Sequence, residues 1–409
     1  GHISFTNLVR DMHKEGIAVI MDVVYNHVSQ YDYNPLKFVD KKYYFRLDSD
    51  NNYLGHSGCG NDLMTERPMT RRLIIDSLKR WMIDFHVDGF RFDLAAMIDW
   101  ETLDAIKREL TAINPDVILI AEPWGGGGYD PAGMSARGYA AWNDVFRNTI
   151  KGQNPHDGLG LIFGEYWGGA DFDKIKSLIL GYETVEGGFF QDAAHSVNYL
   201  ESHDDHTLGD FIRLGLRNVS EEDSIVDLEK HTKLDKEELA ISKLAALILM
   251  TSRGPVMIAE GQEFARSKVI ANTDAPDPRI GRIDHNSYEK DNETNWLNYD
   301  LADLNRELSD YYRDLINCRK DFPLITHAAR DDYTFFRGSG EKSFGFIIES
   351  DTLEIAVLIN PDESSAEFDL PGNRWKVQTG HDCVNAMKSS ESSMNFGVLP
   401  ISGVILLKR

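Results

Sequence analysis

Hydrophobic residues follow two alternating patterns along the first 320 residues. Short continuous apolar runs predict buried β-strands, and stretches with apolar residues three or four positions apart predict amphipathic α-helices. The predicted strands cover residues 17–24, 87–93, 117–121, 138–142, 196–200 and 254–259. The predicted helices cover residues 5–15, 66–86, 100–113, 171–180, 236–250 and 304–319.

Strands that alternate with helices predict an α/β fold with a parallel sheet. In parallel barrels and doubly wound sheets, functional sites form at the carboxyl ends of the strands. Polar residues follow these predicted strands along the chain. The polar residues at or just after the ends of these strands include Asn26, His27, Arg91, Asp93, Glu122, His203 and Asp204.

A different pattern begins after Pro323. Short strands separated by turn residues are predicted at 334–337, 343–350, 353–360, 365–370, 375–378 and 404–408. Such a run is typical of an all-β sandwich. We therefore predict two domains: residues 1–322 form an α/β domain, and residues 323–409 form a C-terminal β-sandwich.

Composition narrows the classes of partner. The chain has 409 residues, a formal net charge of −23 and 42% hydrophobic residues. The negative charge argues against a nucleic-acid partner, and no apolar run approaches the ~20 residues of a membrane span. Cys59, Cys318 and Cys383 are odd in number and far apart, which fits neither a disulfide framework nor a zinc site.

Candidate chemistry is concentrated in three carboxylates: Asp93, Glu122 and Asp204. Arg91 and Asp93 point to the same side of a strand, so the cation favours an ionised Asp93 that can act as a nucleophile. Glu122 follows an apolar strand and precedes Pro123 and Trp124, surroundings that would raise its pKa. A nucleophilic carboxylate beside a protonated one is what glycosidic cleavage requires.

Other interpretations of the same residues stay open at this point. Arg91 and Asp93 could form only a structural ion pair. Residues 203–206 could hold a metal ion, although adjacent strand residues face opposite ways and cannot all converge. Residues 125–128 resemble a phosphate-binding loop in composition alone, and we interpret them as a flexible loop. Trp124, Tyr25 and Tyr31 could provide flat surfaces for sugar rings.

Four motifs in chain order then carry a resemblance. Residues 22–27 (DVVYNH), 89–93 (GFRFD), 121–124 (AEPW) and 199–204 (YLESHD) resemble the four signature regions of the α-amylase superfamily, glycoside hydrolase family 13. Within it the chain looks most like the type I pullulanase and isoamylase debranching enzymes. The pointers are residues 57–62, 85–95 and 261–268, with Asn286, Tyr288, Asn295 and Trp296 downstream.

The resemblance implies a role for each matching residue. Asp93 matches the nucleophile, Glu122 the acid/base, and Asp204 the carboxylate that stabilises the transition state. His27, Arg91 and His203 match the family's sugar contacts, and Asn26 and Trp124 are expected to bind substrate beside them. Enzymes of this family retain the anomeric configuration, so we expect the carboxyls of Asp93 and Glu122 to lie about 5–5.5 Å apart.

The implied activity is hydrolysis of α-1,6 branch linkages in α-glucans such as pullulan, glycogen or starch limit dextrins. An α-1,4-acting amylase, a glucan transferase and a non-catalytic glucan-binding piece are the alternatives. No cofactor is implied, although the family sometimes binds calcium for stability. One departure is Asp205, which stands where pullulanases usually have Asn.

The second departure concerns the barrel itself. The family fold is a (β/α)8 TIM barrel, and this chain begins just before what resembles the third strand. We therefore expect a C-terminal fragment whose barrel lacks its first two strands, and a missing N-terminal part of the same protein is an expected partner. The sequence does not indicate whether the protein is cytoplasmic or secreted.

Overall fold

The structure is a computed structural model that describes residues 1–29, 33–372, 374–379, 383–387 and 393–408. It separates into two compact units. The first comprises Gly1–Trp142 and Phe189–Ser196, and the second comprises Asn143–Gly188 and Val197–Arg409. In the second unit β19 (Ser402–Lys408) packs against α10 (Lys236–Thr251), where a Cβ on Gly403 would meet Leu247. The C-terminal strands are thus grouped with helices that precede them, and the boundary at 322–323 stays a prediction.

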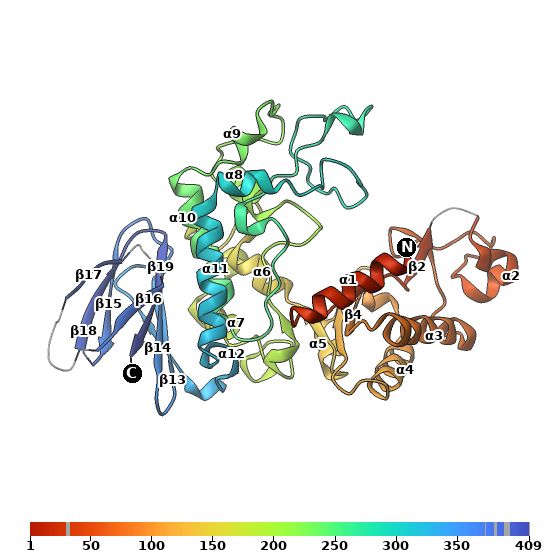
Figure 1. The fold of residues 1–409 in the computed structure, drawn as a ribbon, viewed down its shortest axis with the longest axis horizontal. Helices are drawn as coiled ribbons and strands as arrows, with labels where there is room; N and C mark the ends of the chain where they lie inside the picture. The colour runs from red at the N-terminus through yellow and green to blue at the C-terminus, as the bar shows by residue number, and fades with distance from the viewer. Residues whose placement is uncertain (30–32, 373, 380–382, 388–392, 409) are drawn as a thin grey trace. The chain divides into compact units, whose positions relative to one another are not determined.

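The first unit alternates helices and strands (Figure 1). Its helices are α1 (His2–Lys14), α2 (Pro35–Tyr44), α3 (Pro68–Phe85), α4 (Trp100–Thr111) and α5 (Pro131–Ala136). Its strands are β1 (Ile20–Val23), β2 (His27–Ser29), β3 (Gly60–Asp62), β4 (Gly89–Phe92), β5 (Ile118–Ala121), β6 (Trp124–Gly125), β7 (Gly128–Tyr129) and β8 (Ala140–Trp142). β11 (Ser196–Val197) lies at the boundary between the units.

A parallel sheet in the order β1-β4-β5-β8 forms the centre of the first unit. β4 is buried along its whole length, as expected for a strand with a neighbour on each side. β1 is different, because it ends the sheet and only Val23 is buried in it. The prediction of a buried strand is wrong for this run, because Ile20 and Asp22 are exposed and Met21 is only half-buried.

Helix α3 illustrates how the sequence pattern becomes packing in the first unit. Its buried residues repeat at helical spacing: Thr70, Ile74, Leu78, Met82 and Phe85. Pro68 occupies the first turn, where a missing N–H costs nothing. The helix ends at His86, which adopts a left-handed conformation (φ 59°) and turns the chain toward β4.

The second unit contains helices followed along the chain by an all-β region. Its helices are α6 (Asp144–Ile150), α7 (Phe172–Ile179), α8 (Leu208–Gly215), α9 (Leu228–Thr232), α10 (Lys236–Thr251), α11 (Arg306–Asp321) and α12 (Leu324–His327). Its strands are β9 (Gly152–Asn154), β10 (Gly158–Leu159), β12 (Tyr333–Arg337), β13 (Phe344–Glu349), β14 (Glu354–Asn360), β15 (Ala366–Pro371), β16 (Lys376–Thr379), β17 (Cys383–Met387), β18 (Ser393–Val398) and β19 (Ser402–Lys408).

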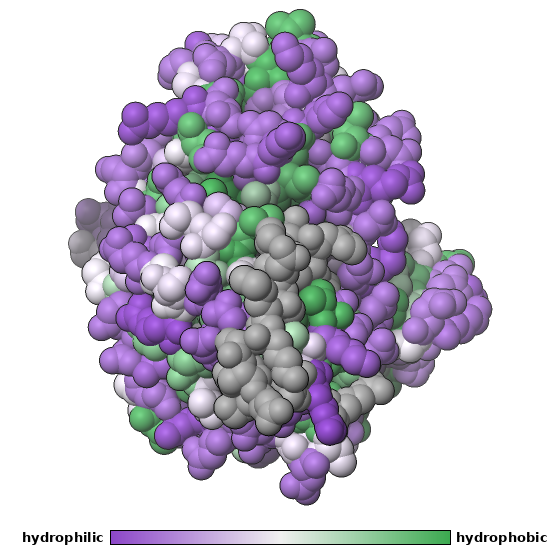
Figure 2. Space-filling model, turned by 90° about the vertical axis from the view of Figure 1, so that its left-hand side faces the viewer, coloured by the Kyte–Doolittle hydropathy of each residue, from purple (hydrophilic) through white to green (hydrophobic). Residues whose placement is uncertain are grey.

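The C-terminal strands form two antiparallel sheets, in the orders β12-β13-β14-β19-β16 and β15-β18-β17. Their shared core takes Leu358 and Leu406 from one sheet and Phe368 and Phe396 from the other. The predicted sandwich is therefore confirmed. On the side of the molecule where these strands lie, hydrophilic residues dominate and hydrophobic ones are scattered among them (Figure 2).

Three predictions about elements need correction. The predicted strand 254–259 makes only the bridge Asn198–Val256 among the described residues, since Pro255 has no N–H and its carbonyl accepts from Asn198. The segment 28–62, for which no helix or strand was predicted, contains α2 and most of the β2-β3 pair among its described residues. Residues 125–128 belong to the β6-β7 hairpin, whose turn uses positive φ angles at Gly126 and Gly127, and not to a flexible loop.

Candidate active site

The register of the parallel sheet places two carboxylates side by side. Phe92 in β4 is opposite Ala121 in β5, so Asp93 and Glu122 occupy the next rung. The backbone ladder continues through them: Asp93 donates its N–H to Val23 (3.0 Å), and Glu122 donates its N–H to Phe92 (3.0 Å). Both carboxylates therefore start from fixed backbone positions on neighbouring strands.

Arg91 holds three carboxylates at once. Its Nη1 lies 2.8 Å from Asp22 Oδ1 and 3.2 Å from Asp93 Oδ1, and its Nη2 lies 2.9 Å from Glu122 Oε2. Burial opposes the charged guanidinium, but the carboxylates of Glu122, Asp22 and Asp93 outweigh it and raise the pKa of Arg91. The guanidinium is also stacked 4.3 Å over the ring of Trp142.

The surroundings of Asp93 and Glu122 differ less than the sequence predicts. Glu122 was expected in apolar surroundings, with the cation reserved for Asp93. Instead the same guanidinium contacts both, because Arg91 sits between the two strand ends. The separation of about 5–5.5 Å between the carboxyls of Asp93 and Glu122 stays a prediction.

The turn after β4 also contacts Glu122. Leu94 donates its N–H to Glu122 Oε2 (2.8 Å), and Ala95 donates its N–H to the Glu122 carbonyl (2.9 Å). Leu94 adopts a positive φ of 37°, which is strained for a branched side chain. The chain leaves Asp93 through this turn, so Leu94 and Ala95 both continue the backbone from Asp93 and hold Glu122 by hydrogen bonds.

Asn26 positions Asp93 and does not face solvent. Its Nδ2 donates to the Asp93 carboxylate (2.9 Å) and carbonyl (2.7 Å), and its Oδ1 lies 2.6 Å from His27 Nδ1. Asn26 is only 1% exposed and its amide supports Asp93, while its contact with substrate stays a prediction. His27 remains partly exposed at the end of this chain of hydrogen bonds.

The aromatic candidates fall into different places. Trp124 is 39% exposed on the β6-β7 hairpin, with its ring 4.5 Å from that of Tyr129. Tyr25 directs its hydroxyl to Ser77 Oγ (2.8 Å) and so packs against α3. Tyr31 lies outside the described residues. Of these three aromatic residues, Trp124 is the one that is exposed and also close to Glu122 in the sequence.

His203 and Asp204 belong to the second unit. His203 Nε2 lies 3.4 Å from Asp204 Oδ2, and both side chains are partly exposed. Asp205, the residue at the departure from the pullulanase pattern, faces Arg147 (3.7 Å) and His285 (3.5 Å). Among the described residues, no group of three or more His, Cys, Asp or Glu side chains is arranged to hold a metal ion, the 203–206 segment included.

Sequence reasoning missed two contributors, Asp22 and Trp142. Asp22 stood in the first motif, and its pairing with Arg91 follows from the β1-β4 register, in which the two residues are direct partners. Trp142 ends β8 and contacts Arg91 through its ring. An aromatic residue at the end of a predicted strand was the available signal.

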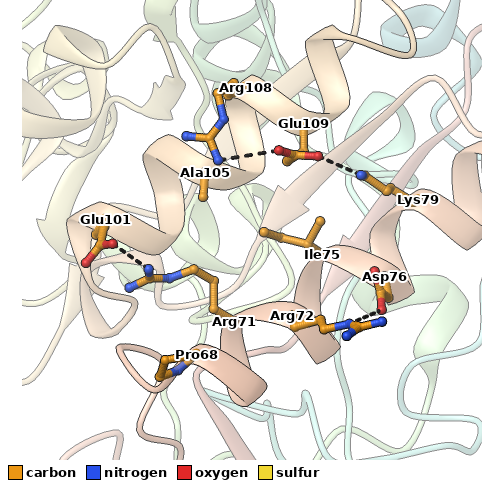
Figure 3. Close-up of a pocket in the computed structure, with 10 residues that line it drawn as sticks. All are labelled: Pro68, Arg71, Arg72, Ile75, Asp76, Lys79, Glu101, Ala105, Arg108 and Glu109. Carbon is orange, nitrogen blue, oxygen red and sulfur yellow. Dashed lines mark hydrogen bonds and ion pairs between the residues drawn. The ribbon is translucent and has the colours of Figure 1, made fainter.

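A cavity of about 320 Å³ lies elsewhere in the first unit (Figure 3). Its walls are α3 and α4, and Arg71, Arg72, Lys79 and Arg108 each point to a carboxylate. None of the predicted site residues lines it. The chemistry of Arg91, Asp93 and Glu122 makes the strand ends the candidate active site.

The described fold is thus a parallel α/β sheet with Arg91, Asp93 and Glu122 together at its strand ends, followed by a β-sandwich. Pullulanase from Bacillus subtilis is 29% identical over 327 residues, which are 77% of this chain and 41% of that protein. A glycogen debranching enzyme from Dickeya chrysanthemi is 29% identical over 91% of this chain and 59% of its own length. No protein-family model matches the chain.

Solved structures agree with these relatives. Pullulanase from Bacillus acidopullulyticus has a TM-score of 0.80 at 27% identity, over 98% of this chain and 48% of that one. Pullulanase from Paenibacillus barengoltzii, complexed with maltohexaose and alpha-cyclodextrin, has a TM-score of 0.80 at 30% identity, over 98% and 60%. The chain thus spans about half the length of its relatives. The resemblance to the debranching enzymes of the α-amylase superfamily is confirmed.

No helix in the described part of the chain combines the length and the apolar character needed to cross a membrane.

Proposed function

We propose that this chain carries the catalytic centre of a retaining glycoside hydrolase that cleaves α-1,6-glucosidic branch linkages in α-glucans. The observation that carries the proposal is Arg91 bound to both Asp93 and Glu122 at adjacent strand ends. One guanidinium fixes the nucleophile and the acid/base relative to each other. The pullulanase and glycogen debranching relatives support the choice of linkage.

In the first step Asp93 attacks the anomeric carbon while Glu122 donates its proton to the glycosidic oxygen, which leaves as the free hydroxyl of the released chain. A glycosyl ester on Asp93 remains. In the second step Glu122 removes a proton from water, the water oxygen attacks the anomeric carbon, and Asp93 leaves as a carboxylate. Asp204 stabilises the positive charge that develops on the sugar ring in both transition states.

The test is release of reducing ends from pullulan and from amylose, measured side by side. The expected result is release from pullulan and not from amylose. Asp93→Asn and Glu122→Gln should each lower turnover by at least about a thousandfold while leaving the far-UV circular dichroism spectrum unchanged. Near-normal turnover in either variant would refute the assignment, and release from amylose alone would indicate an α-1,4-acting enzyme.

We also propose that the open edge of β1 is occupied in the working enzyme by further strands from the same protein. Ile17, Ile20 and Val24 are 52%, 38% and 50% exposed, and these are residues that a neighbouring strand would cover. Co-expression of this chain with the segment that precedes it in the gene should give a complex and raise pullulan hydrolysis. Full activity of this chain as a monomer would contradict the proposal.

We propose that the reaction needs no cofactor, since carboxylates carry both chemical steps. Activity after dialysis against a chelator should equal activity with added calcium. A loss of thermal stability in chelator, with turnover per folded molecule unchanged, would instead reveal a cation with a structural role.

A further inference from the structure

Lys268 lies beneath the segment that carries Asp204 in the second unit. It follows the 3₁₀ helix η6 (Gln262–Phe264) and is only 3% exposed. Its Nζ donates to the carbonyl of Asp205 and lies 3.4 Å from the carbonyl of His203. These are the carbonyls of the two residues that flank Asp204, so one ammonium group spans the residue from both sides.

The backbone of Lys268 is itself fixed. Its N–H donates to Asp210 Oδ2 (2.9 Å), and its carbonyl accepts from the N–H of Asp284 (2.7 Å). Asp210 is fully buried in α8 and lies 3.3 Å from Arg213 Nη1. The ammonium group therefore extends from a rigid base, and a buried donor that lost its carbonyl partners would be costly.

The segment around Asp204 needs such support. Asp205 has a φ of 58°, in the left-handed region that a residue other than glycine adopts at a cost. Among the described residues, the N–H of Asp204 donates to Ser202 Oγ alone, at 3.3 Å. The side chain of Asp204 is 36% exposed, so neighbouring side chains leave it open to a ligand. The direction of its carboxylate therefore depends on His203 Nε2, which lies 3.4 Å from Asp204 Oδ2, and on the backbone on either side.

We propose that Lys268 is a positioning residue that fixes the backbone of residues 203–205 and thereby the direction of the Asp204 carboxylate. Its effect on catalysis rests on the proposed function, in which Asp204 stabilises the transition state. Its effect on the backbone does not. Burial lowers the pKa of Lys268, and the carboxylates of Asp210 and Asp284 oppose this shift.

A buried lysine can also serve general stability, and the second unit offers a matched control. Lys243 is 9% exposed in α10 and its Nζ lies 2.6 Å from Glu307. None of its hydrogen bonds and ion pairs among the described residues involves 203–205. Lys243→Met thus removes a buried ammonium group without removing a partner of the segment.

The experiment is hydrogen–deuterium exchange on the full chain, followed on peptides that span 202–207. Lys268→Met should accelerate exchange in these peptides by about tenfold or more, while Lys243→Met leaves it at the original rate. Lys268→Arg, whose guanidinium can still donate to both carbonyls, should restore most of the protection. If Lys268→Met does not fold, Lys268→Gln is measured by the same criterion.

Unchanged exchange in the Lys268→Met variant would overturn the proposal. Equal acceleration in Lys243→Met, or no rescue in Lys268→Arg, would also overturn it, because each indicates a general loss of stability. Pullulan hydrolysis supplies the second measurement: Lys268→Met should lower kcat at least tenfold with KM within about threefold. A chain that cleaves no glucan would refute the proposed function, while the exchange result would still decide the role of Lys268.

Discussion

The parallel sheet of the first unit and the sandwich of the second contain similar apolar strands with opposite fates. Ile20 in β1 is 38% exposed, whereas Ile355 in β14 is fully buried. β14 has a neighbour on each side and a second sheet across its face. β1 has a neighbour only in β4 among the described residues. An apolar run therefore predicts a strand, but its burial depends on what lies beside it.

The comparison extends to what holds each region together. The sandwich relies on side chains that interlock between two sheets, such as Phe368 and Phe396. At the carboxyl end of the parallel sheet, a single cation joins β1, β4 and the residue after β5 through Asp22, Asp93 and Glu122. At the strand ends of the first unit, ion pairs thus join neighbouring strands, whereas apolar side chains join the two sheets of the sandwich.

The largest expected effect comes from removing that cation. Arg91→Met should lower the free energy of unfolding of the first unit by about 3–5 kcal/mol, because the buried Glu122 carboxylate loses the cation paired with it. Urea denaturation followed by tryptophan fluorescence measures the loss. Arg72→Met is the control, since its i,i+4 pair with Asp76 is exposed and should matter by less than about 0.5 kcal/mol. If the two substitutions lowered the free energy of unfolding equally, the buried cation would not stabilise the strand ends in the way proposed for the first unit.

The next effect tests the comparison through identical chemistry at two sites. Ile355→Ala should destabilise the second unit by about 2–5 kcal/mol, because it leaves a cavity in a closed core. Ile20→Ala removes the same atoms from an exposed edge and should cost less than about 1 kcal/mol. Denaturation midpoints of the two variants give the difference. A large cost at Ile20 would mean that β1 is covered in solution, for example by a second copy of the chain.

Much of this fold follows from periodicity in the sequence. The helices α3, α4, α10 and α11 lie within two residues of their predicted bounds. α3, α4 and α11 each carry an apolar stripe, and α10 is buried over most of its length. β18 was missed among polar residues, although Met394, Phe396 and Val398 alternate along it toward the sandwich core. Residues 254–259 show the reverse error, since apolar character alone did not reveal the missing N–H of Pro255.

The candidate site was predictable in membership but not in detail. Motif and strand position identified Arg91, Asp93 and Glu122. They could not show that the Asn26 amide donates to the Asp93 carboxylate, because the two residues are far apart in the sequence. They also could not show Lys268 beneath Asp204, since hydrogen bonds to backbone carbonyls leave no sequence pattern.

A smaller effect concerns Glu201, a buried side chain of the second unit that forms no ion pair among the described residues. Glu201 is 2% exposed and accepts from the N–H of Leu208 (2.7 Å), and burial raises its pKa to about 7 from 4.5. The native state therefore keeps a proton that the unfolded state loses between pH 4.5 and about 7. The stability from Glu201 is complete below this window and is lost as the pH rises through it.

Glu201→Gln should remove this dependence. Between pH 5 and pH 7 the free energy of unfolding of the unsubstituted chain should fall by about 2 kcal/mol more than that of the variant. Urea denaturation at the two pH values measures the difference. Lys151, whose pKa burial lowers to about 7, contributes stability that grows above pH 7, so the comparison is made below that value. Parallel pH dependence in the two proteins would show that Glu201 is ionised throughout.

The smallest effect separates exposed ion pairs from the buried one within the first unit. Lys79 in α3 lies 2.7 Å from Glu109 in α4, with the two side chains 32% and 36% exposed, at the cavity in Figure 3. Lys79→Gln should cost less than about 1 kcal/mol, because water screens the pair. A double-mutant cycle with Glu109→Gln, in low and in high salt, isolates the coupling, which should shrink as salt is added. A coupling free energy above about 2 kcal/mol that does not fall with added salt would mean that ion pairs hold α3 to α4. The first unit would then depend on ion pairs in general, and Arg91 would be one example among several.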